Sequence, residues 1–190
     1  DMGLGKTLQT LTWLSWLRTS RRKNAKTKPS LVVCPASVLH NWRRESERFT
    51  PDMKVLVLES GQARHNLRKK VPDHDIVVTN YSILRRDLEA LSKFDFRAII
   101  LDEAQFIKNP SAQVTKSVKE LKADHKLALT GTPIENRMLD LWSIVDFVQP
   151  NYLGNQDHFS QVYDLRGAEK DESAARIARR KLSAKLRPLL

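Results

Sequence analysis

Ala98-Ile-Ile-Leu101 runs directly into Asp102-Glu-Ala-Gln105, so a short apolar segment ends in two carboxylates and an amide. Short segments rich in branched aliphatic residues and without polar alternation are typical of strands buried on both faces of a parallel sheet. Open α/β sheets bind their ligands at the carboxyl ends of such strands. The segment therefore predicts a parallel α/β domain with acidic groups at the ligand-binding edge.

Four further segments share this apolar character and complete the expected sheet. They are residues 31–34, 55–58, 76–79 and 127–130. Amphipathic stretches between the strands indicate helices over residues 7–17, 37–49, 82–91 and 112–121. Alternation of strands and helices implies right-handed crossovers and a three-layer α/β domain.

The pattern changes after Pro133, where helical periodicity replaces the strand signals. Apolar residues at 138, 141, 142, 145 and 148 form one stripe of a helix. Further helices are expected over residues 158–163 and 169–186, and no strand is expected after Thr130. We therefore divide the chain into a lobe over residues 1–150 and a helical extension over residues 151–190.

The charge of the chain favours a polyanionic partner. The 190 residues include 33 Lys and Arg against 22 Asp and Glu, a formal net charge of +11. Nearly half of these cations fall in three runs without an acid, at residues 18–28, 64–70 and 176–187. A single run is typical of a solvated face, but three runs beside nucleotide-binding motifs favour nucleic acid.

Composition also excludes several classes of protein. The single cysteine, Cys34, rules out a disulfide framework within the chain and a cysteine-rich zinc site, and a buried position is expected for it. No apolar run approaches the roughly 20 residues that a membrane-spanning helix needs. The five histidines lack metal-ligand spacing. The aromatic rings of Trp13, Trp16 and Trp42 are expected to pack in the core.

Gly3-Leu-Gly-Lys-Thr7 predicts the end of a phosphate-binding loop that enters a helix. Glycine backbone N–H groups can surround phosphate oxygens, and the positive end of the helix dipole favours an anion. Lys6 can reach the β- and γ-phosphates of ATP, and the Thr7 hydroxyl can ligate Mg²⁺. A flexible glycine turn is the alternative. The expected nucleotide-binding residues are Gly3, Leu4, Gly5, Lys6 and Thr7.

The acidic segment supplies the expected catalytic partners of this loop. Asp102 is expected to contribute to the Mg²⁺ shell, and Glu103 to orient and polarise the attacking water. A strand end capped by acids is the alternative interpretation. Together with Lys6 and Gln105, these two acids form the candidate catalytic group.

Thr130-Gly-Thr132 closes another expected strand, and Pro133 follows it. The two hydroxyls, with Gln105, can form a polar relay between the γ-phosphate and a second ligand site. Thr130, Gly131 and Thr132 are therefore candidate coupling residues. Turn chemistry alone explains the same pattern.

Taken together, these motifs resemble the first RecA-like lobe of the Swi/Snf-type ATPases, within the superfamily-two helicase-like motors. The resemblance extends from residue 1 to about residue 163. It implies a three-layer RecA-like P-loop domain with a mainly parallel sheet and a helical C-terminal part. It rests on residues 1–9, 34–42 with Glu45, 79–81, 101–105 with Lys108 and Asn109, and 129–136.

Two features of the chain depart from the family pattern. Gln105 stands where many members carry histidine. The glutamine motif that contacts adenine would lie upstream of Asp1. The full phosphate-loop pattern also needs a residue before Asp1, so the chain is expected to begin inside that loop.

The resemblance implies an ATP-driven translocase on double-stranded DNA that remodels DNA–protein complexes. ATP and Mg²⁺ are the implied cofactors. The implied partners are double-stranded DNA, DNA-bound proteins and a second RecA-like lobe in the same full-length chain, toward which residues 151–190 would lead. The residues implied to face DNA, holding phosphates and not reading bases, are Pro35, Ala36, Ser37, Asn41, Thr79 and Asn80.

Three further expectations follow from this resemblance. A catalytically silent nucleic-acid-binding module of the same fold is the alternative function, and the intact Lys6 and Glu103 disfavour it. The 190 residues alone are expected to hydrolyse ATP weakly or not at all, because the second lobe would supply arginine donors. The expected location is inside the cell, with the bacterial cytoplasm favoured over the nucleus, and no membrane partner is expected.

Overall fold

The computed structural model describes residues 5–20, 27–61, 63–131, 138–163 and 172–189, and within the last range the side chains of residues 172–175, 178 and 179 are left aside. Its centre is one sheet in which every pairing is parallel. The strand order is β2-β3-β1-β4-β5. The five strands are β1 (Ser30–Cys34), β2 (Val55–Leu58), β3 (Ile76–Asn80), β4 (Phe96–Leu101) and β5 (Ala123–Ala128).

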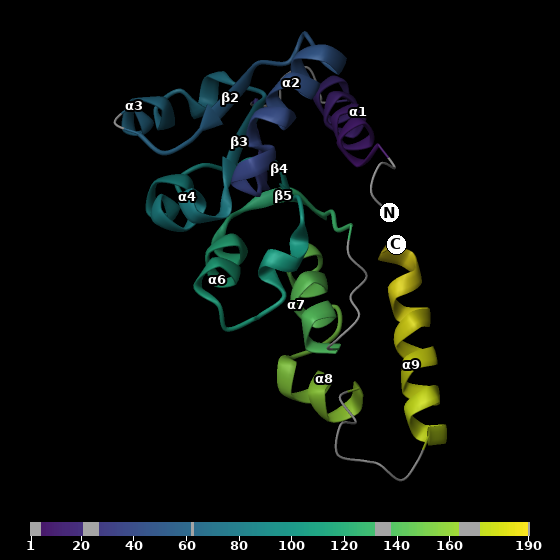
Figure 1. The fold of residues 1–190 in the computed structure, drawn as a ribbon. Coiled ribbons are helices and arrows are strands. Elements are labelled where there is room, and N and C mark those ends of the chain that lie inside the picture. The colour runs from purple at the N-terminus through teal and green to yellow at the C-terminus, as the bar shows by residue number, and fades with distance from the viewer. Residues whose placement is uncertain (1–4, 21–26, 62, 132–137, 164–171, 190) are drawn as a thin grey trace.

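Helices connect the strands and continue beyond the sheet (Figure 1). The α-helices are α1 (Lys6–Thr19), α2 (Leu39–Phe49), α3 (Arg64–Arg68), α4 (Tyr81–Arg86), α5 (Leu88–Leu91), α6 (Gln113–Glu120), α7 (Met138–Val148), α8 (Gln156–Tyr163) and α9 (Glu172–Leu186). Short 3₁₀ turns are η1 (Ala36–Val38), η2 (Val71–Asp73), η3 (Ala104–Ile107) and η4 (Arg187–Leu189).

The sheet lies between two helical layers, as the alternation of strands and helices predicts (Figure 1). Successive strand residues point to opposite faces, so Val32 and Val33 belong to different cores. On one face, α1 and α2 contribute the buried Leu11, Leu14, Leu39 and Trp42. On the other face, α4, α6 and α7 contribute Leu84, Val118, Ile144 and Phe147. The three-layer α/β fold is confirmed.

Three local expectations differ from the structure. The last strand covers Ala123–Ala128 and not residues 127–130. Its first half was missed because β5 is an edge strand whose exposed Asp124 and His125 interrupt the apolar pattern. The expected helix over 82–91 is divided at Asp87 into α4 and α5. Trp16 is 60% exposed, because it lies two positions from the inward-facing Leu14.

A buried ion pair joins α3 to the break between α4 and α5. Asp87 is 3% exposed. Its two carboxylate oxygens lie 3.0 Å from Arg64 Nε and 2.9 Å from Arg68 Nη1. These arginines belong to the basic run at residues 64–70. Two of the four cations of that run therefore pair with an acid of the same chain, and their presence in the sequence needs no external polyanion to explain it.

Helix α7 joins the sheet to the C-terminal helices. Ile144 and Phe147 pack into the core under the sheet. Trp142 and Val145 belong instead to a separate cluster with Phe159 and the α9 leucines Leu182 and Leu186. Because α7 contributes to both cores, it fixes the position of the helices that follow.

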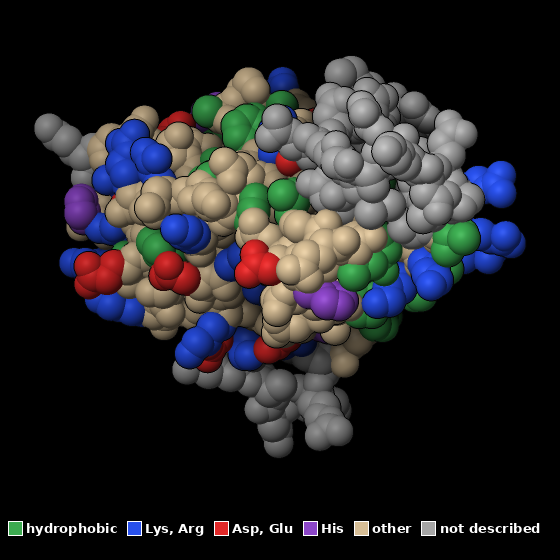
Figure 2. Space-filling model, turned by 90° about the horizontal axis from the view of Figure 1, so that it is seen from below, with side chains coloured by type: hydrophobic (Ala, Val, Ile, Leu, Met, Phe, Trp, Pro, Cys, Tyr) green, Lys and Arg blue, Asp and Glu red, His purple; other side chains and the backbone are tan. Residues whose placement is uncertain are grey.

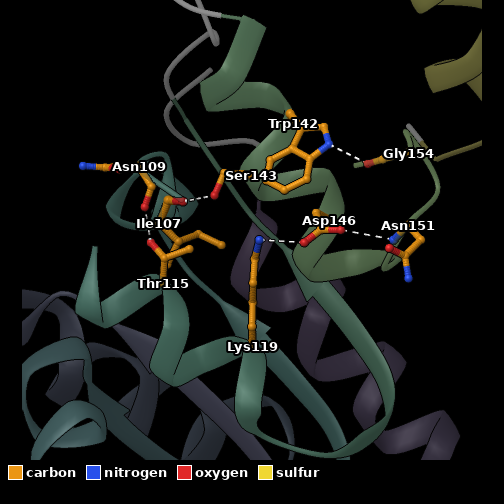
Figure 3. Close-up of polar contacts among 9 residues, drawn as sticks. All are labelled: Ile107, Asn109, Thr115, Lys119, Trp142, Ser143, Asp146, Asn151 and Gly154. Carbon is orange, nitrogen blue, oxygen red and sulfur yellow. Dashed lines mark hydrogen bonds and ion pairs between the residues drawn. The ribbon is translucent and has the colours of Figure 1, made fainter. Parts of the chain in front are cut away.

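Polar contacts hold α7 on both sides (Figure 3). The Ser143 hydroxyl donates to the carbonyl of Ile107 at 2.7 Å, just after the acidic segment. Lys119 Nζ lies 2.7 Å from Asp146 Oδ2. The indole N–H of Trp142 donates to the Gly154 carbonyl at 2.9 Å.

Among the described residues, no helix is both long enough and apolar enough to span a membrane.

Candidate active site

The candidate site lies where α1 begins and where β4 and β5 end. Gly5 has a φ of 67° and precedes Lys6, the first residue of α1. Among the residues that the structure describes, no side chain makes a capping hydrogen bond to this helix, and its first turn contains no acid. The first backbone N–H groups of α1 therefore keep their partial positive charge for an anion. Thr7 lies in the same turn, and Gly3 and Leu4 lie outside the described residues.

Gly131 shows that three separate sequence motifs meet at one point. A Cβ atom added at Gly131 would lie 3.0 Å from Lys6 Nζ and 3.9 Å from Glu103 Oε1. Lys6 comes from α1, Glu103 follows β4, and Gly131 follows β5. The structure thus brings together the lysine, the acid and the glycine that the sequence placed in different motifs. Thr132 lies outside the described residues.

Asp102 is fixed by hydrogen bonds from groups that carry no charge. The indole N–H of Trp42 donates to Asp102 Oδ2 at 2.9 Å. The backbone N–H of Glu103 donates to Asp102 Oδ1 at 3.0 Å. The Tyr81 hydroxyl donates to the Asp102 backbone carbonyl at 2.8 Å. One lone pair on each carboxylate oxygen therefore remains available, because each oxygen accepts a single bond from these donors.

Glu103 adopts a strained backbone conformation, with φ 53° and ψ 57°. The left-handed region costs a residue with a Cβ atom about 1–2 kcal/mol. Immediately after it, the chain turns into η3. Such strain is concentrated at functional sites, where surrounding contacts maintain it. Here the conformation turns the chain sharply at the end of β4.

A polar relay links Glu103 to the end of β5. The Gln105 side-chain N–H donates to Glu103 Oε2 at 2.8 Å. The Thr130 hydroxyl donates to Gln105 Oε1 at 3.0 Å. The sequence suggests a relay of the threonine hydroxyls with Gln105, and the Thr130–Gln105 bond is consistent with it. The Gln105–Glu103 bond is an addition from the structure. Their role in coupling two ligand sites stays a prediction.

The donor set around Asp102 fits Mg²⁺. Among the described residues, no ion pair involves Asp102 or Glu103, and no three His, Cys, Asp or Glu side chains gather into a complete metal cage. Mg²⁺ is typically held by only one or two carboxylates together with waters and substrate phosphates. Asp102, with the Thr7 hydroxyl, would supply that partial set.

The residues expected to face DNA divide into accessible and buried ones. Ala36, Ser37 and Asn41 are exposed on η1 and the start of α2, while Pro35 and Asn80 are half-buried. Asn80 Oδ1 accepts the Ile83 N–H at 3.0 Å and so caps α4.

Thr79 is a correction to the sequence-based expectation. Its side chain is completely buried, and its hydroxyl donates to the Leu58 carbonyl at 3.0 Å. A buried side chain cannot contact DNA. The residue is still paired with both neighbouring strands, with Val33 of β1 and Leu58 of β2, and β3 ends one residue later at Asn80.

Two further side chains near Asp102 are buried. Cys34 is fully buried as expected, its thiol donates to the Thr79 carbonyl at 3.7 Å, and burial, with the nearby Asp102 charge, raises its pKa to about 12. Burial, again with the Asp102 charge, also raises the pKa of Tyr81, which keeps its hydroxyl protonated as a donor. Trp42 is buried as expected, but its bond to Asp102 and that of Tyr81 were missed. The sequence signals them only by an aromatic residue on the helix after β1 and another at the start of the helix after β3.

Comparison with known proteins assigns a family to this arrangement. The sequence model of the SNF2-related domain matches residues 1–190. The TATA-binding protein-associated factor MOT1 of Saccharomyces cerevisiae is 36% identical over 207 residues, covering 100% of this chain and 11% of that protein. An uncharacterized ATP-dependent helicase of Mycoplasma pneumoniae is 44% identical over 165 residues, covering 86% of this chain and 16% of that protein.

Solved structures agree with the sequence matches. The SWI2/SNF2 ATPase core of Sulfolobus solfataricus in complex with double-stranded DNA superimposes with a TM-score of 0.86 at 40% identity. The match covers 99% of this chain and 37% of that one. The ATPase core domain from the same organism gives a TM-score of 0.82 at 40% identity, covering 99% of this chain and 36% of that one. The chain thus spans a small part of its curated relatives and somewhat over a third of these structures.

Proposed function

Because the chain belongs to the SNF2-related domain family, we propose that it is the ATP-binding lobe of a DNA-dependent ATPase that translocates on double-stranded DNA and remodels DNA–protein complexes. The observation that carries the proposal is the meeting of Lys6, Glu103 and Gly131 at one point. A lysine, an acid and a turn without a Cβ atom, close together, suit the binding of a nucleoside triphosphate. On this view residues 1–150 form the lobe, and residues 151–190 lead toward a second lobe.

Each side chain at this point has a distinct task in ATP hydrolysis. The Lys6 ammonium would neutralise charge on the β- and γ-phosphates, and the uncapped start of α1 would add backbone N–H donors. Mg²⁺, when bound, would balance phosphate charge beside Asp102 and Thr7. Glu103 would orient the attacking water, and the Gln105 amide on its Oε2 would hold the carboxylate in place.

DNA binding is assigned to the accessible segment that begins η1 and α2. Ala36, Ser37 and Asn41 are exposed there, and backbone N–H groups with short polar side chains suit phosphate oxygens. The structural relative from Sulfolobus solfataricus is an ATPase core in complex with double-stranded DNA, which supports the same class of partner. A DNA substrate implies a location inside the cell, in a bacterial cytoplasm or a nucleus.

The test is steady-state ATP hydrolysis by the full-length protein with and without double-stranded DNA. We expect DNA to stimulate turnover, and we expect Lys6→Ala to abolish it by removing the phosphate cation. Lys93→Ala is the matched control, because Lys93 pairs only with the exposed Glu89. DNA binding without any hydrolysis would favour the silent binding module instead.

A second measurement tests whether the site is complete within one lobe. The 190-residue chain and the full-length protein are compared at saturating DNA. We expect the chain alone to turn over far more slowly, because it lacks the arginine donors of the second lobe, and an arginine finger is worth about 10³–10⁵-fold in related phosphoryl transfers. Equal turnover would contradict the two-lobe mechanism.

A further inference from the structure

Two chain segments that leave the sheet beside the proposed DNA surface both donate hydrogen bonds to Asp102. Trp42, on α2, donates its indole N–H to the carboxylate oxygen Oδ2 at 2.9 Å. Tyr81, at the start of α4, donates its hydroxyl to the backbone carbonyl at 2.8 Å. The two helices lie on opposite faces of the sheet. Asp102 is therefore held from both layers at once.

Both donors are themselves buried. Trp42 is 2% exposed and Tyr81 is 5% exposed, so neither side chain can reach a ligand on the surface. Each one directly follows a polar residue that is exposed or half-buried, Asn41 in the first case and Asn80 in the second. A ligand that contacts Asn41 or Asn80 at the surface would therefore act one residue away from a side chain that is hydrogen-bonded to Asp102.

The two bonds control different features of the acidic segment. The Trp42 N–H fixes one oxygen and so sets the plane of the carboxylate, which decides where its remaining lone pairs point. The Tyr81 hydroxyl fixes the peptide group that leads into the left-handed Glu103. One bond thus orients Asp102, and the other orients Glu103 through the backbone.

We propose that Trp42 and Tyr81 are positioning residues that link the DNA-facing ends of α2 and α4 to Asp102, so that DNA bound at the surface adjusts the acidic segment. The proposal rests on the function proposed above. A shift of α2 moves the indole and reorients the carboxylate, and a shift of α4 moves the peptide before Glu103. Neither residue touches nucleotide or DNA.

The experiment uses two substitutions in the full-length protein that each remove the donor and keep most of the ring. Trp42→Phe removes the indole N–H, and Tyr81→Phe removes one oxygen atom. Trp13→Phe is the matched control, because Trp13 packs on the same face of the sheet, 5.8 Å from the His125 ring, away from the acids. Melting temperature reports the loss of packing in all three variants.

The decisive readout is binding of a fluorescent ADP analogue at increasing Mg²⁺ concentration. We expect Trp42→Phe to raise the Mg²⁺ concentration for half-maximal binding about tenfold, as loss of a partner behind a metal ligand does elsewhere. Trp13→Phe should leave it within twofold. A purely structural role for Trp42 would lower the melting temperature and leave the Mg²⁺ requirement unchanged, which would overturn the proposal.

The second readout is the ratio of turnover with and without double-stranded DNA. We expect both donor variants to lose most of this stimulation, while their affinity for DNA, measured by fluorescence anisotropy, stays within twofold of the unaltered protein. Stimulation equal to that of the Trp13 variant would overturn the link. Tyr81→Phe decides this point on its own if Trp42→Phe fails to fold.

The proposed function and the link can fail separately. Absence of DNA stimulation in the unaltered protein would contradict the proposed function. The Mg²⁺ titration would then still decide whether Trp42 positions Asp102.

Discussion

Asp87 follows helix α4 and Asp102 follows strand β4, so each acid stands at the end of an element, but their partners differ in charge. Asp87 meets Arg64 and Arg68, at 3.0 and 2.9 Å. Asp102 accepts hydrogen bonds from the indole of Trp42 and a backbone N–H, both neutral. Asp87 is buried, whereas Asp102 is half-buried at the open edge of β4.

The difference separates an acid that holds the fold from one that is available for chemistry. Two arginines more than balance the charge of Asp87, so no further cation is attracted there. Neutral donors fix the direction of the Asp102 carboxylate and leave its negative charge in place. A site that must attract and release a cation needs the second arrangement, because a resident arginine would compete with it.

Glu103→Gln should produce the largest effect, because Glu103 lies beside Asp102 in the acidic segment proposed to carry out hydrolysis. The variant keeps the shape of the side chain and removes the charge that orients water. We expect turnover to fall about 10²–10⁴-fold while the nucleotide stays bound. Single-turnover hydrolysis and analogue binding measure the two effects, with the exposed Glu47→Gln as control. Hydrolysis at the unaltered rate would refute the role assigned to Glu103.

Asp87→Ala tests the structural side of the same comparison. Removing the acid leaves Arg64 and Arg68 half-buried without their partner, which should lower the free energy of unfolding by about 3–5 kcal/mol. Thermal melting measures the loss, and the exposed Asp95→Ala serves as control. The folded fraction should still bind nucleotide normally. A melting temperature equal to that of the control would show that this ion pair adds no stability.

Gly131→Ala should have a smaller effect, confined to the phosphate side of the site. The added Cβ would lie 3.0 Å from Lys6 Nζ, so the flexible lysine must move away. We expect ATP affinity to fall about tenfold, since small misplacements of a charged group are costly in such sites. In a Lys6→Ala background the same change should cost nothing further. An additional loss in that background would place the clash elsewhere.

The smallest effect is expected from a basic residue on α9 that is available to bind DNA. Arg180 is exposed on α9, and none of the ion pairs between described residues involves that helix. Figure 2 shows Lys and Arg side chains standing out at its right-hand edge, where α9 lies. Arg180→Gln should reduce the slope of log affinity for DNA against log salt by about one.

Arg68→Gln is the matched opposite of that variant, because Arg68 pairs with the buried Asp87. It should lower stability and leave the salt slope of DNA binding unchanged. A reduced slope for Arg68 with none for Arg180 would reverse the assignment of the two basic runs.

The sequence predicted strands β1 to β4 because each contains a continuous apolar run, whether it lies inside the sheet or, like β2, at its edge. It failed where an element depends on a distant partner. The edge strand β5 carries Asp124 and His125 directly after its first residue, and neither gives a strand signal. Helix α3 forms beside an acid 19 to 23 residues away in the chain, a contact that periodicity cannot reveal.

The candidate site divides in the same way. Lys6, Glu103 and Gln105 could be selected as candidate site residues, because each belongs to a short motif of consecutive residues. Trp42 and Tyr81 were not, since an aromatic residue on the helix after a strand has the same local pattern whether its polar atom bonds to backbone, water or a catalytic acid. Thr79 was misjudged because one position along a strand decides between edge and interior.

The burial of Cys34 has a practical consequence for measuring motion in this protein. The residue is the single cysteine among the 190, is fully buried, and has a pKa raised to about 12, so almost none of it is thiolate at neutral pH. Thiol-reactive dyes need the thiolate. A cysteine introduced at the exposed Ser37 or Asn41 would therefore take up a fluorophore without prior removal of the native thiol. This lobe is thus ready for site-specific labelling of its proposed DNA surface.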